Sequence, residues 1–230
     1  MNSALLLVSL WAFLSGALVN LWLNNDGREV LKDYLPAQDL PTRTRGFYMV
    51  TLMQVMTWSL TARDPLLAVS VSVIALLATL AWVDALTHRL PTALINVATM
   101  MVILTITVTV FLSFAYPLFP APRGGYEVLF GAVTGALVWT VPLLLVHLAG
   151  LGLGRGDVRL APVLGMWLGA YGAGVAFGGL VYAFLIAGAV AIWKLATRRA
   201  TLHSKIAFGP SMVGGALLGW VTLSRAISWL

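Results

Sequence analysis

Long apolar runs are the feature that most constrains how this chain folds. The clearest covers residues 93–116 and contains no Asp, Glu, Lys or Arg. A helix needs about 20 apolar residues to cross a hydrocarbon layer of about 30 Å. Over the whole chain 60% of residues are hydrophobic and 10% are charged, and the mean hydropathy is +0.93, far from the balance of a soluble domain. We therefore expect an all-α, polytopic integral membrane protein.

Eight apolar runs are predicted as transmembrane helices, and the range is six to eight because the second and sixth runs are short. Either short run fits a tilted or partial span. With 230 residues, little of the chain remains for a soluble domain, so residues 1–230 are expected to form one transmembrane domain with a short cytosolic loop at about 24–46. Gly172 and Gly174 predict a tight hairpin between the sixth and seventh helices. The runs are residues 4–23, 47–62, 66–83, 93–116, 128–149, 160–173, 175–196 and 209–230.

The distribution of Lys and Arg predicts the orientation of these helices, because cytosolic loops are enriched in both residues. If the N-terminus lies outside the cytosol, eleven cations fall on the cytosolic side and three on the other. This bias and the even number of spans predict that both termini lie outside the cytosol. The cytosolic cations are Arg28, Lys32, Arg43, Arg45, Arg89, Arg155, Arg159, Lys194, Arg198, Arg199 and Lys205, and the others are Arg63, Arg123 and Arg225.

Composition also limits the chemistry that the chain can perform. Cysteine is absent, which excludes disulfides, thiolate zinc sites and a cysteine nucleophile. The three histidines, at positions 88, 147 and 203, are scattered, so we expect no metal and no cofactor. The net charge of +6 is not arranged as a basic stripe with aromatic residues, so we interpret the cations as topology signals and expect no nucleic-acid partner.

Two of the eight acidic residues stand apart from the others. Asp84 ends the third apolar run, and Asp157 lies between the fifth and sixth runs, so both fall on the predicted cytosolic side. The loop at residues 24–46 is interpreted as a solvated segment with Glu29 and Asp33 on one face of a short helix. The six acids assigned to loops and turns are Asp26, Glu29, Asp33, Asp39, Asp64 and Glu127.

Asp84 and Asp157 allow a structural and a functional interpretation. Asp157 precedes a helical run and fits an N-cap, and Asp84 fits an ion pair with His88 or Arg89 at a helix end. The glycines before Asp157 favour a functional role instead, because their alternation predicts an irregular backbone that approaches another group closely. Two aspartates that share a proton can hydrolyse a peptide bond. The alternating glycines are Gly150, Gly152, Gly154 and Gly156.

Four segments resemble type IV prepilin peptidases, a family of intramembrane aspartyl proteases. Residues 154–159, GRGDVR, resemble the glycine-x-glycine-aspartate signature, and the following LAPVLGMWLG resembles the next helix of the family. Asp84 is followed seven residues later by Pro91 in DALTHRLP, similar to the segment of the first catalytic aspartate. Residues 205–219, KIAFGPSMVGGALLG, resemble the Phe-Gly-Pro segment that opens the last helix, and residues 15–23 are more weakly similar to the first helix.

The resemblance implies an enzyme of the bacterial cytoplasmic membrane that removes the short basic leader from prepilins or pseudopilins at the cytosolic face. Asp84 and Asp157 match the catalytic pair, Gly154 and Gly156 match the motif glycines, and Arg159 stands where the family usually has lysine. Many members carry a zinc-binding insert with paired cysteines and also N-methylate the product. This chain lacks cysteine and has only the short loop at residues 24–46, so we expect peptidase activity without methylation.

Other functions remain as alternatives. A preflagellin peptidase or a signal-peptide-type member of the same protease group would use the same aspartates. A proton-coupled transporter would place its acids near the middle of the membrane, and a non-enzymatic secretion-system subunit would need no paired acids. His147, about ten residues before Asp157, is expected to be a hydrogen-bonded residue at a helix end rather than a catalytic group.

Overall fold

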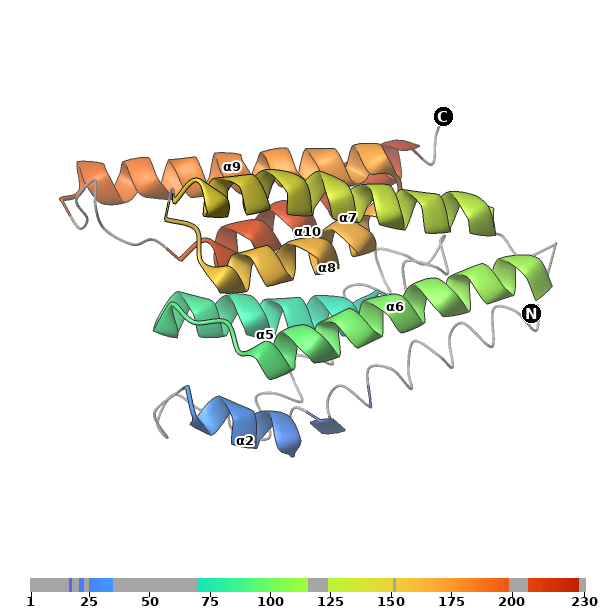
Figure 1. Cartoon of the computed structure of the whole chain (residues 1–230), viewed down its shortest axis with the longest axis horizontal. Helices are drawn as coiled ribbons and strands as arrows, with labels where there is room; N and C mark the ends of the chain where they lie inside the picture. The colour runs from blue at the N-terminus through green and yellow to red at the C-terminus, as the bar shows by residue number, and fades with distance from the viewer. Residues whose placement is uncertain are drawn as a thin grey trace. The chain divides into compact units, whose positions relative to one another are not determined.

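The computed structural model describes residues 17, 21–22, 25–34, 70–115, 124–150, 152–198 and 207–227. Within these ranges the chain forms seven helices and no strand, which confirms the all-α prediction for this part of the chain (Figure 1). The predicted run at 47–62 lies outside the described residues, as does nearly all of the run at 4–23. The helices are α2 (Asp26–Lys32), α5 (Val71–Thr87), α6 (Thr92–Ala115), α7 (Gly125–Leu148), α8 (Arg155–Gly169), α9 (Ala173–Ala196) and α10 (Gly209–Ile227).

Three of the described helices are long and apolar enough to cross a membrane: Thr92–Phe111 within α6, Gly125–Leu148 and Ala173–Ala196. Large apolar side chains are exposed on these helices, which is the arrangement that contact with lipid requires. The membrane prediction is therefore supported by three helices, whereas the orientation of the termini stays a prediction. The exposed apolar residues of α7 and α9 include Tyr126, Phe130, Leu137, Leu145, Leu148, Phe177, Leu185, Ile192 and Trp193.

The chain divides into two compact units, residues 1–79 with 91–126 and residues 80–90 with 127–230. The described part of the first unit holds α2, the beginning of α5 and α6. Leu31 of α2 is buried, and Lys32 forms an exposed ion pair with Glu29. The short helix expected in the loop at residues 24–46 is therefore present.

Glycines bring α7 and α8 into backbone contact in the second unit. A Cβ atom added at Gly165 would lie 2.3 Å from the carbonyl oxygen of Gly135, and one added at Gly169 would lie 2.1 Å from the carbonyl oxygen of Gly131. The glycines are spaced four residues apart on each helix, so they form one stripe along the contact. No larger residue fits at these positions unless the helices separate.

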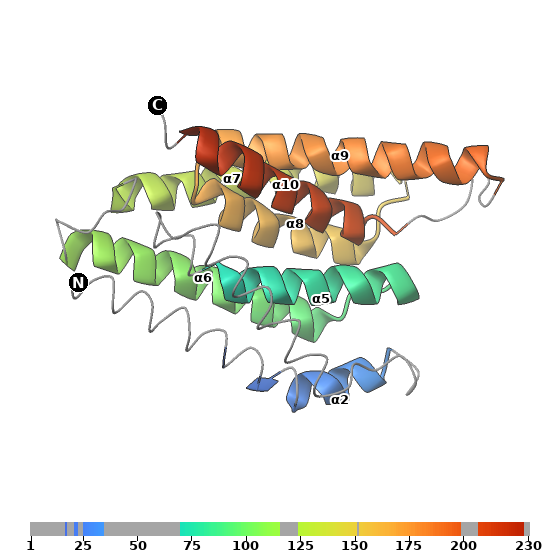
Figure 2. The same ribbon diagram turned by 180° about the vertical axis from the view of Figure 1, so that it is seen from behind.

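Helix α9 lies alongside α10, as Figures 1 and 2 show. A Cβ atom at Gly215 would lie 2.2 Å from the backbone nitrogen of Ala183, so small residues bring these two helices close as well. Trp139 of α7 donates its Nε1–H to the carbonyl of Ala176 in α9, 2.8 Å away and buried. The rings of Trp167 and Trp220 pack with centroids 5.9 Å apart and link α8 to α10.

The predicted hairpin between α8 and α9 is present. Gly172 has a φ of +129°, a value that favours glycine, and its N–H donates to the carbonyl of Gly169 at 2.8 Å. Gly174 lies inside α9 with open space around it, so the turn needs only one of the two glycines. Helix α8 begins at Arg155 rather than at residue 160, because its capped first turn precedes the apolar residues. Its 15 residues extend about 22 Å, which is short for a transmembrane helix.

Candidate active site

Asp84 lies in the last turn of α5, and its side chain is buried, with 4% exposed. The helix ends just beyond it, where His88 adopts a φ of +52° and donates its backbone N–H to the carbonyl of Asp84 at 2.9 Å. Oδ2 of Asp84 accepts a buried hydrogen bond of 3.1 Å from the N–H of Gly209, the first residue of α10. The ion pair with His88 or Arg89 proposed as the structural alternative is not found among the described residues.

Gly209 fits this contact because it has no side chain. A Cβ atom there would lie 2.6 Å from Oδ2 of Asp84, closer than carbon and oxygen approach without displacement. The sequence alone singled out the segment around Gly209 through its resemblance to Phe-Gly-Pro, but it gave no indication that the glycine contacts Asp84. Asp84 and Gly209 lie 125 residues apart in the sequence, so no local pattern indicates their contact.

Asp157 is the third residue of α8 and is also buried, with 9% exposed. Its Oδ2 accepts the N–H of Gly154 at 3.2 Å. The structural alternative placed Asp157 at the N-cap itself; Gly154 occupies that position instead, and Asp157 caps the helix from within its first turn. Arg155 and Arg159 lie on the same helix and are exposed.

The structure brings the two acids together. Burial raises the pKa of Asp157 to about 6, the negative charge of Asp84 adds to this rise, and the Gly154 N–H opposes it. The segments that carry the acids also touch, since a Cβ atom at Gly156 would lie 3.0 Å from Cβ of Leu90. Asp84 and Asp157 therefore belong to one site within the second unit.

The glycines before Asp157 serve different purposes. Gly150 and Gly152 have φ values of +71° and +85° with no atom within 4 Å of an added Cβ, so the turn geometry alone requires them. Only Gly156 makes the close approach to another segment that the alternation predicted. The ring of His147 bonds the carbonyl of Leu153 through Nδ1 at 2.8 Å, which confirms its expected role as a hydrogen-bonded residue at a helix end.

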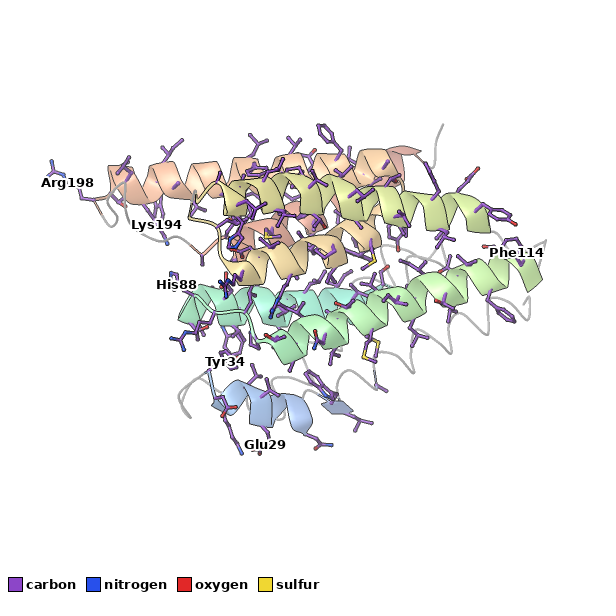
Figure 3. All side chains as sticks on the ribbon, in the orientation of Figure 1. Glu29, Tyr34, His88, Phe114, Lys194 and Arg198 are labelled. Atoms are coloured by element: carbon purple, nitrogen blue, oxygen red, sulfur yellow. The ribbon has the colours of Figure 1, made fainter. Side chains whose placement is uncertain are left out.

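Several basic side chains lie at the same end of the second unit as the two acids. Figures 1 and 3 show that the end of α5, the start of α8, the end of α9 and the start of α10 lie at this end, and that His88, Lys194 and Arg198 mark it. In the described part of the chain, no group of three or more His, Asp or Glu side chains is suited to hold a metal ion. Among the described residues, the site contains two carboxyl groups, each of which accepts a hydrogen bond from a backbone N–H.

No protein-family model matches the chain, and comparisons with curated proteins and with solved structures give no match either. The resemblance to prepilin peptidases stays a prediction from the motifs of Asp84 and Asp157 and the segment around Gly209.

Proposed function

We propose that the chain is a prepilin leader peptidase of the bacterial cytoplasmic membrane, an aspartic endopeptidase that cuts between the basic leader and the apolar helix of a prepilin or pseudopilin. One observation carries the proposal: Asp84 and Asp157 are both buried, each accepts a glycine N–H, and the charge of Asp84 raises the pKa of Asp157. The order of the two acids and their surrounding motifs are similar to those of this family.

The pair can divide the work of peptide hydrolysis between its members. The ionised carboxylate takes a proton from water, whose oxygen attacks the scissile carbonyl carbon, while the protonated carboxyl donates to the carbonyl oxygen. The C–N bond then breaks as the first carboxyl gives its proton to the leaving nitrogen, and a hydroxyl proton of the intermediate returns to the second. Burial and the charge of Asp84 raise the pKa of Asp157 to about 6, which favours one proton shared by the pair over two anions.

The cations near the site support a cytosolic location for it. Arg155 begins α8 and Lys194 lies in the last turn of α9, at the same end of the second unit as both acids (Figure 3). Because Lys and Arg are enriched on the cytosolic side of membrane proteins, this end is proposed to face the cytosol. The basic leader of a prepilin is presented from that side, and its apolar helix would remain in the lipid bilayer.

The test is to co-express the chain with a candidate prepilin and to compare wild type, Asp84→Asn, Asp157→Asn and Glu127→Gln by leader removal. Glu127 is an exposed acid at the start of α7 and serves as the control. We expect wild type and Glu127→Gln to process the prepilin and both Asn variants to lose at least about a thousandfold in rate. If either Asn variant still processes fully, the shared-proton mechanism is wrong; a wild type that leaves every prepilin intact contradicts the proposal.

The same assay separates the alternatives. If the chain belongs to another branch of the protease group, it would cut a preflagellin or a membrane-bound signal-peptide remnant and leave the prepilin intact. A transporter would cut none of these substrates. Purified enzyme given S-adenosylmethionine is expected to leave the new pilin N-terminus unmethylated, as mass spectrometry of the product would show.

A further inference from the structure

We propose that the backbone N–H of Gly209 positions Asp84 for catalysis, so that the start of α10 contributes a third element to the site. The inference rests on the proposed peptidase and deepens it by naming a positioning residue. It starts from the buried bond of 3.1 Å between Gly209 N–H and Oδ2 of Asp84.

The location of Asp84 explains why such a donor is needed. The carboxylate lies in the last turn of α5, where unpaired carbonyl groups carry a partial negative charge that disfavours an anion. The first turn of α10 carries the opposite partial charge, because its N–H groups lack partners within the helix. The contact with Gly209 thus supplies the favourable interaction that the helix of Asp84 does not.

In the first turn of α10, the N–H that contacts Asp84 is that of Gly209. Pro210 has no N–H, and Met212 donates its N–H to the carbonyl of Phe208 at 3.0 Å. The ring of Phe208 packs on Phe184 of α9, with centroids 5.7 Å apart, which fixes the segment that precedes α10. Both contacts hold Phe208, the residue before Gly209, while the N–H of Gly209 points to Asp84.

Gly209→Ala is the discriminating variant, and Gly214→Ala is its matched control in the same helix. The added Cβ would lie 2.6 Å from Oδ2 of Asp84 at position 209, whereas at position 214 its nearest neighbour is Cδ1 of Ile186 at 3.4 Å. A hydrogen bond to a charged group contributes enough that its loss should lower kcat about ten- to a hundredfold. We expect Gly209→Ala to show this loss with KM within about twofold, because the bond acts on the reacting group, and Gly214→Ala to match wild type.

Equal kcat values for the two variants, or a rise in KM with unchanged kcat, would overturn the inference. Circular dichroism and gel filtration in detergent check that each variant folds. Should Gly209→Ala not fold, glycolic acid incorporated at position 209 by cell-free synthesis replaces the amide by an ester and removes the N–H without adding a side chain. The ester chain is then expected to show the same loss of kcat.

A second measurement does not depend on activity. Isotope-labelled aspartate incorporated at position 84 alone by cell-free synthesis isolates the carboxylate stretch of Asp84 in infrared spectra. We expect Gly209→Ala to shift this band and Gly214→Ala to leave it unchanged, and an unshifted band in Gly209→Ala contradicts the contact. A wild type that cleaves no prepilin would refute the proposed function, while the infrared comparison would still decide whether Gly209 holds Asp84.

Discussion

The carboxyl of Asp157 opposes folding when it is ionised. Its pKa in the folded chain is about 6, above the usual value of 3.8, because burial and the charge of Asp84 both disfavour the anion. The protonated carboxyl therefore stabilises the folded chain fully below pH 3.8, and this stabilisation is lost as the pH rises through about 6. Asparagine resembles the protonated form and can still accept the N–H of Gly154.

We expect Asp157→Asn to be more stable than wild type near pH 8, by up to about 3 kcal/mol at about 1.4 kcal/mol per unit of pKa shift. Below about pH 4 the difference should disappear, because both side chains are then neutral. Thermal unfolding in detergent at both pH values measures the effect, with Glu127→Gln as an exposed control that should show no such dependence. A variant less stable than wild type near pH 8 would contradict this account.

The sequence singled out Asp84 and Asp157 as candidates, but it did not indicate their hydrogen-bond partners. A carboxylate beside an apolar run is costly, so its presence is informative in itself. The groups that hold the two acids are backbone N–H groups, which every residue except proline carries, so the sequence does not distinguish Gly209 from other donors. The role of Gly156 was clearer, since a close approach was expected there and Leu90 provides it.

At the scale of helices, glycine contacts determine how α7 and α8 pack. At Gly165 an added Cβ would lie 2.3 Å from the carbonyl oxygen of Gly135, and backbone atoms cannot move aside as a flexible side chain would. We expect Gly165→Ala to lower the free energy of unfolding by about 1–3 kcal/mol. Gly188→Ala on α9, where no atom lies within 4 Å, should be neutral or slightly stabilising. Unfolding of both variants in detergent provides the comparison, and equal stabilities would show that the contact is unimportant.

The sequence located the described helices well but not their ends. Apolar runs determine where a helix lies, whereas capping determines where it begins and ends. Thus α5 continues past residue 83 to Thr87, and α8 begins at Arg155, where Asp157 caps the first turn. The spacing of four between Gly131 and Gly135 and between Gly165 and Gly169 was readable as a helix-packing signal. The sequence did not indicate which two helices this signal would join.

For the whole molecule, the absence of native cysteine makes the predicted topology directly testable. Ala173 and Ala196 are the exposed end residues of α9, whose 24 residues extend about 36 Å, enough to cross a bilayer. We expect a membrane-impermeant maleimide to label Ala173→Cys in intact spheroplasts and Ala196→Cys only in inverted vesicles. The reverse pattern would place the two aspartates outside the cytosol and would contradict the proposed function.

The sequence predicted less at this scale than at the others. Hydropathy and the positive-inside bias gave eight spans and an orientation, of which the described residues support the membrane character of three helices. The pairing of α9 with α10 and the contact of α7 with α8 depend on how surfaces of small residues fit together, and hydropathy does not record that fit.

The unequal lengths of α8 and α9 have a consequence for the surrounding bilayer. Both helices start from the hairpin at Gly172, but α8 has 15 residues and α9 has 24, so α8 ends about 14 Å short of the far end of α9. In a bilayer that matches the length of α9, α8 is too short to reach the same surface, so we expect local thinning of the lipid or water beside Asp157. In the proposed peptidase, a thinner bilayer at this point would let water reach the scissile peptide bond while the apolar helix of the substrate stays in the lipid.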